Sequence, residues 1–177
     1  AEEFDRLSAA EKLAACGWDD VTALYRREVL LRIPFRRTTF AEDAIWARDA
    51  LRAGHAIVYN PAARVYHFHT ESPEFTFKRT LTAMYYRYRS FGYIYEEPKL
   101  ALPFLRAVRI LAREQSLSWS EKAAWSRYVW RNLRASDSAI RAFRQAAAQG
   151  SSTLDSLHER SCGLPPVPQK SSGLQPV

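Results

Sequence analysis

Cysteine is scarce in this sequence, and long apolar runs are absent. Its two cysteines, Cys16 and Cys162, stand far apart, which argues against a disulfide framework and against a zinc site. No uninterrupted run of about 20 apolar residues occurs, so the sequence predicts no membrane-spanning helix. We therefore expect a cytoplasmic chain, with at most peripheral contact at the inner face of the membrane.

Several motifs that are typical of nucleotide-binding proteins and of serine hydrolases are also missing. The chain contains no Gly-x-Gly-x-x-Gly, no glycine-rich loop that cradles a phosphate and no nucleophile elbow. It contains no Asp-x-Asp, a spacing that presents two carboxylates to a divalent cation. These absences exclude the familiar phosphate-binding and serine-nucleophile signatures.

What is present includes enough apolar residues for a real core and an uneven distribution of charge. Of the 177 residues, 47% are hydrophobic, which suits one ordinary domain with a helical extension. Residues 1–75 carry 10 Lys and Arg against 12 Asp and Glu, whereas residues 76–149 carry 14 against 5. A basic, aromatic-rich helical surface suits anionic lipid headgroups or a phosphate-bearing acceptor. A solvated arginine face that covers apolar surface is an equally good interpretation.

The apolar pattern predicts an α/β fold. Helical spacing is expected at residues 1–17, 27–33, 42–53, 73–91, 100–112 and 119–148. Strand-length segments at 21–25, 56–59 and 64–69 predict a mixed sheet of two to four strands, on which the 42–53 helix packs. The region from residue 150 onward is rich in Ser, Pro, Gly and Gln and is predicted to be disordered.

The stretch from Phe40 to Thr70 gathers the residues with chemical potential. An acidic pair, Glu42 and Asp43, begins the predicted helix, for which Thr38 or Thr39 is a suitable cap. On its own, such a pair more often stabilises the helix dipole than serves catalysis. Further along, His67 and His69 alternate on the last predicted strand, so that Tyr66 and Phe68 are expected to point into the core.

This stretch resembles the family 2 glycosyltransferases of the GT-A fold, in their C-terminal, acceptor-side part. The resemblance rests on Glu42-Asp43, Trp46, Ala53-Gly54 and the string Ile57-Val58-Tyr59-x-Pro61-x-Ala63-x-Val65-x-His67-x-His69. It extends over about residues 18–93 and implies a partial GT-A sheet that lacks the nucleotide-binding half. Residues 1–93 then form the acceptor-side half, 94–149 a basic helical extension and 150–177 the disordered tail.

The resemblance also implies roles for individual residues. Asp43 falls where the family keeps its general base, and Glu42 then orients the site or binds acceptor hydroxyls. His67 falls at the position of a metal or diphosphate ligand, with His69 as a weaker candidate. Trp46 is a candidate to stack on an acceptor sugar, although a place in the core is favoured. The cofactor implied is a divalent cation, Mn²⁺ or Mg²⁺, held together with the missing half.

The function implied is inverting transfer of a sugar from a nucleotide-diphosphate donor to a glycan or lipid-linked acceptor. Because the Asp-x-Asp motif and the nucleotide-binding half are missing, we expect this chain alone to be inactive. The alternative is a non-catalytic binding or scaffolding module that docks on a partner or an anionic membrane. Nucleic-acid binding, suggested by the sequence pI of about 9.6, is less favoured because no recognised motif supports it.

Overall fold

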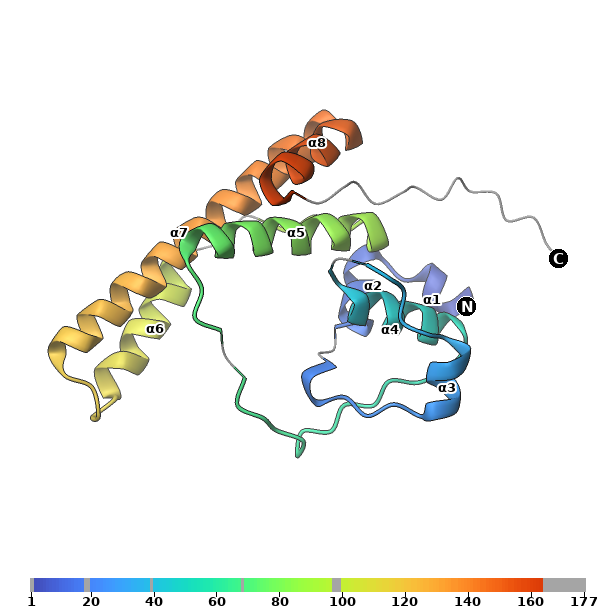
Figure 1. The fold of residues 1–177 in the computed structure, drawn as a ribbon, viewed down its shortest axis with the longest axis horizontal. Coiled ribbons are helices and arrows are strands. Elements are labelled where there is room, and N and C mark those ends of the chain that lie inside the picture. Colours follow the sequence, from blue (N-terminus) through green and yellow to red (C-terminus); the bar gives the residue numbers. More distant parts are fainter. Residues whose placement is uncertain (1, 18–19, 39, 68, 97–99, 164–177) are drawn as a thin grey trace.

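The computed structural model describes residues 2–17, 20–38, 40–67, 69–96 and 100–163, and every regular element in these ranges is a helix (Figure 1). Their bounds in chain order are α1 Glu2–Arg6, α2 Ala9–Ala15, the 3₁₀ helix η1 Asp20–Thr22, α3 Arg27–Arg32, α4 Glu42–Arg52, α5 Pro73–Phe91, α6 Ala101–Arg113, α7 Trp119–Gln149 and α8 Ser151–Cys162.

The predicted α/β fold is therefore wrong, because the described ranges contain no strand. The segment 21–25 begins inside η1, and 56–59 and 64–67 have no regular structure. Of the alternating side chains, Ile57 packs against the core around Ala44 and Phe91. The Val58 side chain is 86% exposed, however, and that of Tyr66, predicted to be buried, is 104% exposed. A strand persists only when a neighbouring strand pairs with its backbone, and the described ranges provide no such neighbour. Phe68 lies outside the described residues.

The main core lies where α5, α7 and α8 pack together. Its centre is formed by five side chains that are 0% exposed, namely Leu81, Tyr85, Ala139, Phe143 and Leu154. The long helix α5 starts and ends as its sequence predicts. Ser72 caps it by accepting a hydrogen bond from the Phe75 amide, Pro73 occupies its first turn, and Gly92 ends it with a left-handed φ of 72°. The predicted helix 73–91 is confirmed.

Helix α8 corrects the prediction that disorder begins at residue 150. Gly150, with a φ of 118°, separates α7 from α8, and the chain then folds back so that Leu154 and His158 are fully buried. Asp155 accepts hydrogen bonds from the Tyr85 hydroxyl at 2.7 Å and from Arg89 at 3.0 Å. Composition misled the prediction because most helical stability in proteins comes from tertiary packing, and Leu154 and His158 pack on the core that α5 and α7 form. Residues 164–177 lie outside the described part of the chain.

A second, smaller core joins the N-terminal helices to α4 and the end of α5. It contains Phe4, Cys16, Ala44, Ala47 and Phe91. The predicted helix over 1–17 is divided in two, because Ser8 caps α2 with a reciprocal bond to Glu11. Burial raises the pKa of the Cys16 thiol to about 11, so this cysteine is a packing residue. The division of the chain at residue 93 stays a prediction.

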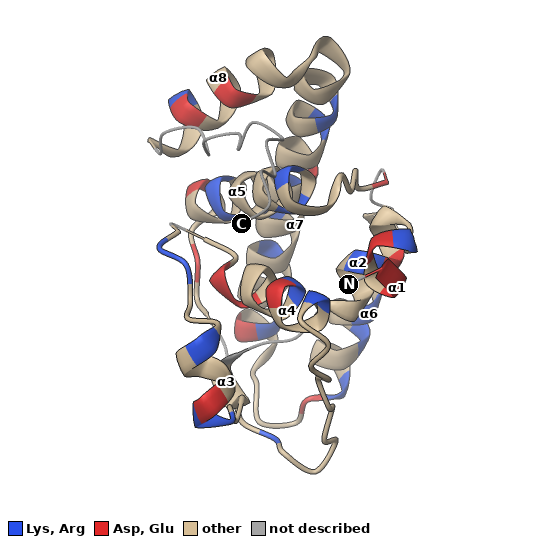
Figure 2. Cartoon of the chain, turned by 90° about the vertical axis from the view of Figure 1, so that its right-hand side faces the viewer, with Lys and Arg blue, Asp and Glu red and all other residues tan. Residues whose placement is uncertain are grey.

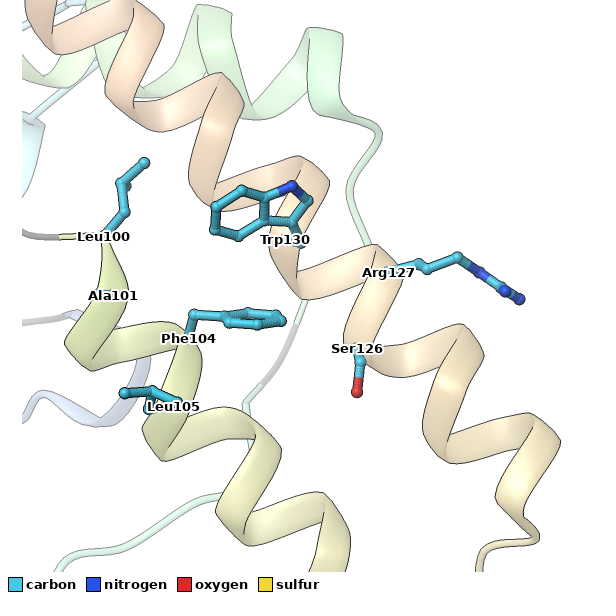
Figure 3. Close-up of a pocket in the computed structure, with 7 residues that line it drawn as sticks. All are labelled: Leu100, Ala101, Phe104, Leu105, Ser126, Arg127 and Trp130. Atoms are coloured by element: carbon cyan, nitrogen blue, oxygen red, sulfur yellow. The ribbon is translucent and has the colours of Figure 1, made fainter.

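Helices α6 and α7 form an antiparallel hairpin over residues 100–134, which we call the α6–α7 hairpin. The rings of Phe104 and Trp130 meet between its helices, with centroids 5.0 Å apart (Figure 3), and Lys122 donates a hydrogen bond to the Ala112 carbonyl. Helices α1, α4 and α8 carry both signs of charge (Figure 2), whereas α6 carries arginine alone. Within the described ranges, no helix combines the length and the apolar character needed to cross a bilayer.

Candidate functional site

The acidic pair begins α4, as predicted, and the backbone there is unusual. Ala41 precedes the helix with a φ of 59°, a left-handed conformation that costs a non-glycine residue about 1 kcal/mol or more. The amide of Ala44 donates to the Asp43 carboxylate at 2.6 Å, which holds this carboxylate at the helix N-terminus. Glu42 is exposed and Asp43 half-buried. Thr38 bonds to Phe40 and does not cap α4, and Thr39, the other predicted cap, lies outside the described residues.

Asp43 lies in the field of Arg87, a residue of α5. Burial lowers the pKa of the Arg87 guanidinium, and the negative charge of Asp43 acts in the opposite direction. Arg87 also donates to the Tyr95 hydroxyl and lies over the Tyr95 ring, 5.6 Å from its centroid. The half-buried Asp43 carboxylate thus lies in the electric field of the Arg87 guanidinium, and Tyr95 holds that guanidinium in place.

Arg87 also lines a cavity of about 340 Å³ between α5 and α7. Arg79 reaches the same cavity and is paired with Glu71 at 2.6 Å. The remaining lining residues are Phe40, Thr80, Ala83, Met84, Tyr95, Ser136 and Ile140. Two arginines and several hydroxyls around a small cavity suit an anionic group such as a phosphate. Sequence reasoning assigned no role to Arg79 or Arg87, although Thr80, Ala83 and Arg87 recur at helical spacing on one face of α5.

The two candidate histidines lie in the exposed segment that connects α4 to α5. This segment leaves the packed helices and runs as a long loop in Figure 1. The rings of His67 and His69 meet edge to face, with centroids 4.5 Å apart. In the part of the chain that the structure describes, no group of three or more His, Cys, Asp or Glu side chains is arranged to hold a metal ion. These residues alone do not fit a divalent cation, which needs further ligands.

Trp46 belongs to α4, and its ring packs against other aromatic side chains. Its side chain is 7% exposed, and its indole N–H donates to the Ile33 carbonyl at 2.6 Å. The Tyr25 and Phe35 rings lie 5.0 and 5.9 Å from it, centroid to centroid. This contact fixes the face of α4 that turns away from solvent, and with it the position of the acidic pair at its start.

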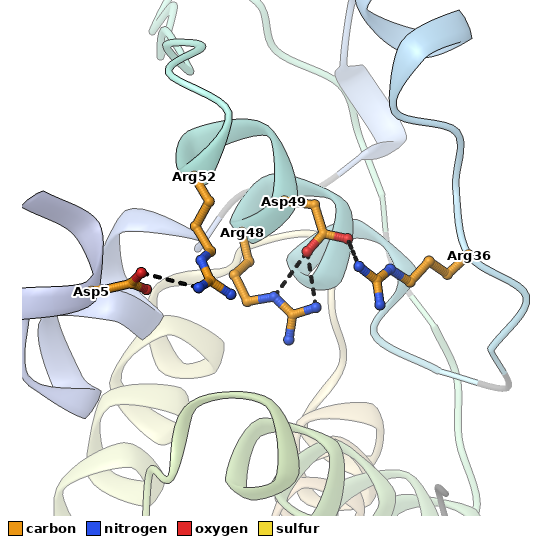
Figure 4. Close-up of polar contacts among 5 residues, drawn as sticks. All are labelled: Asp5, Arg36, Arg48, Asp49 and Arg52. Atoms are coloured by element: carbon orange, nitrogen blue, oxygen red, sulfur yellow. Dashed lines mark hydrogen bonds and ion pairs between the residues drawn. The ribbon is translucent and has the colours of Figure 1, made fainter. Parts of the chain in front are cut away.

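Polar contacts fix the rest of α4 (Figure 4). Asp49 accepts hydrogen bonds from Arg48 and pairs with Arg36 at 2.6 Å, and Arg52 pairs with Asp5 of α1 at 3.0 Å. The bonds of Arg36 and Asp5 reach segments on both sides of the helix. The Asp43 carboxylate therefore projects from a helix that is anchored along its length. Whether Asp43 and His67 share one cleft stays a prediction, and the described lining of the 340 Å³ cavity includes neither.

The fold and site together define a helical chain with an anchored carboxylate at the start of α4 and an arginine-lined cavity between α5 and α7. Comparison with protein families adds that residues 3–85 match the model described as Glycosyltransferase like family 2. The match covers just under half of the 177 residues and includes α1 to α4 and most of α5. This segment is family 2-like, and the resemblance predicted from sequence is confirmed. Neither the curated proteins nor the solved structures contain a match to the chain.

Proposed function

We propose that residues 1–93 are the acceptor-side part of an inverting glycosyltransferase, in which Asp43 is the general base. The observation that carries this proposal is the placement of a half-buried, backbone-bonded carboxylate beside Arg87 within the segment that matches family 2. A base must hold its proton-accepting oxygen in a fixed position, and anchoring of α4 provides this. The left-handed Ala41 immediately before the acidic pair is the kind of backbone strain that gathers at functional sites.

The proposed reaction is attack by an acceptor hydroxyl on the anomeric carbon of a nucleotide-diphosphate sugar. Asp43 removes the hydroxyl proton as the new glycosidic bond forms and the bond to the diphosphate breaks. Glu42, exposed beside it, binds or orients the hydroxyls of a glycan or lipid-linked acceptor. Arg79 and Arg87 supply fixed positive charge for the departing diphosphate, which a divalent cation also stabilises when bound.

The metal part of the proposal needs residues beyond those described. His67, with His69 as a second candidate, contributes at most two imidazoles, and Mg²⁺ or Mn²⁺ requires additional oxygen ligands. The family-like segment contains no Asp-x-Asp that supplies them. We therefore propose that the cation and the sugar nucleotide bind only when a nucleotide-binding half is joined to this chain, and that the isolated chain does not transfer sugar.

The test uses a polypeptide in which this chain is joined to a nucleotide-binding half of family 2 type. Asp43→Asn is expected to lower kcat by about 10²–10⁴-fold, the usual contribution of a general base, with donor affinity nearly unchanged. Glu74→Gln is the matched control, because Glu74 is an exposed carboxylate in the first turn of α5 and tests the helix-dipole role alone. Full turnover by Asp43→Asn, or sugar transfer by the isolated chain, would refute the proposal.

A second candidate function is a non-catalytic docking module, and one observation favours it. Helix α6 contributes no buried side chain to the core, within the described residues, yet exposes Leu102, Leu105 and Ile110 together with its arginines. A helix with this composition suits contact with a partner or with an anionic membrane surface. Docking and catalysis use different parts of the chain, so one protein can combine them.

A further inference from the structure

From the geometry of the α6–α7 hairpin we infer that one of its faces docks on the headgroup layer of an anionic lipid bilayer. This inference deepens the second proposed function by naming the surface and its partner. It is independent of sugar transfer, because the hairpin lies beyond the segment that matches family 2.

The docking face begins with two tryptophans on α7. Trp119 and Trp130 are eleven residues apart, which is three turns of an α-helix, so they lie on the same side. The Trp119 side chain is 83% exposed and that of Trp130 is 38% exposed. Tryptophan gathers at membrane interfaces because its ring is apolar and its N–H bonds to the headgroups.

Between the helices the same face is hollowed by an open, apolar cavity of about 690 Å³ (Figure 3). Phe104, Leu105 and Trp130 form much of its wall, and Leu105 is itself 62% exposed. In Figure 3 the Phe104 and Trp130 rings lie between α6 and α7, whereas the Arg127 side chain points away from α6. Such a surface can take up the upper part of a lipid acyl chain while charged groups stay at its rim.

The charge of the hairpin selects the lipid. Residues 100–134 carry seven Lys or Arg against two Asp or Glu, a net charge of +5. Arg127 and Arg134 follow the tryptophan side of α7, and Arg134 lies over the Trp130 ring, 5.9 Å from its centroid. The edge of the face therefore presents guanidinium groups, which bind the phosphates of an anionic leaflet.

Two other occupants fit this face less well. A second copy of the chain would bring two hairpins of charge +5 together, and their repulsion opposes a dimer at moderate ionic strength. A protein partner also meets an apolar centre with a polar rim, but exposed tryptophan together with an arginine-rich rim favours a layer of anionic headgroups. An apolar strip that holds tryptophan and is edged by arginine instead matches the pattern of a helix lying in a membrane interface.

The experiment measures binding of the full chain to vesicles of phosphatidylcholine alone and of phosphatidylcholine with phosphatidylglycerol, by flotation and by tryptophan fluorescence. We expect binding to the anionic vesicles with a blue shift of the emission. Trp119→Ser and the pair Arg127→Glu with Arg134→Glu should each weaken it by roughly tenfold or more, since each basic residue near the surface contributes about fivefold. Circular dichroism checks that the variants remain helical.

Matched controls place the same chemical changes elsewhere. Leu24→Ser removes an apolar side chain that is 100% exposed, and Arg32→Glu with Arg37→Glu reverses two exposed charges near α3. Neither control should alter vesicle binding. If the chain binds anionic vesicles but the hairpin and control variants behave alike, the hairpin is not the docking element, although membrane docking survives. If no vesicle is bound, or if light scattering shows a dimer that Trp119→Ser dissolves, the lipid assignment is wrong.

Discussion

Two regions have a similar content of apolar residues but differ in how far these residues are buried: the loop between α4 and α5, and the core of α5, α7 and α8. In the loop, Val58 and Tyr66 are 86% and 104% exposed, whereas Tyr85 and Phe143 of the core are 0% exposed. The loop lies inside the segment that matches family 2, and most of the core lies outside it. Apolar side chains thus stabilise a fold only where a partner element covers them, and we expect a nucleotide-binding half joined to this chain to cover the loop.

The largest effect is expected from a change in the core. Phe143→Ala removes a ring that contacts Tyr88, with centroids 5.9 Å apart, and is fully buried. We expect it to lower the free energy of unfolding by about 3–5 kcal/mol, the usual cost of replacing a buried Phe by Ala. Denaturant unfolding followed by circular dichroism measures this. A loss below about 1 kcal/mol would mean that α7 does not pack on α5 as described.

An intermediate effect on the free energy of unfolding, seen only at acidic pH, is expected at His158. Its ring is 0% exposed and stacks on the Tyr85 ring at 4.0 Å, and neither ring nitrogen has a hydrogen-bond partner within the described ranges. Burial lowers the pKa of His158, and the charge of Asp155 opposes this to a smaller extent. The unfolded chain therefore takes up a proton near pH 6.5 that the folded chain does not, so stability decreases as the pH falls below about 6.5.

His158→Phe keeps a ring on Tyr85 and removes the titrating group. The variant should lose a pH dependence of at most about 1.4 kcal/mol per pH unit between pH 6.5 and the lower pKa of the folded state. Unfolding curves at pH 8, 6 and 5 measure it, with His67→Gln in the exposed loop as the control. The same acid dependence in wild type and His158→Phe would show that another group is responsible.

The smallest effect is expected in the loop. Tyr66→Ser removes a fully exposed ring and should change the free energy of unfolding of the isolated chain by less than about 0.5 kcal/mol. In the chain joined to an upstream nucleotide-binding half, the same change should destabilise by 1 kcal/mol or more if that half covers the loop. Equal, small effects in both contexts would end the idea that the loop is a covered surface in the complete enzyme.

Local signals in the sequence determined helices α4 and α5 and their ends. Ser72, Pro73 and Gly92 bound α5, and the helical spacing after Glu42 defines α4, because capping bonds and apolar periodicity act within a few residues. The family resemblance was likewise readable from one stretch, since its motif is contiguous. The roles assigned to Asp43, Glu42 and His67 from that motif remain predictions.

Other features depend on tertiary structure and cannot be read from local signals: the absence of strands in the described part of the loop, the docking of α8 and the proximity of Arg87 to Asp43. The segments 56–59 and 64–67 alternate like strands, yet strand formation depends on a distant partner for the backbone, and the described chain provides none. The composition of α8 predicts disorder, yet its Leu154 and His158 side chains are buried against the core that α5 and α7 form. Arg87 lies in the electric field of Asp43, 44 positions away in the sequence, and this proximity comes from packing and not from any local sequence pattern.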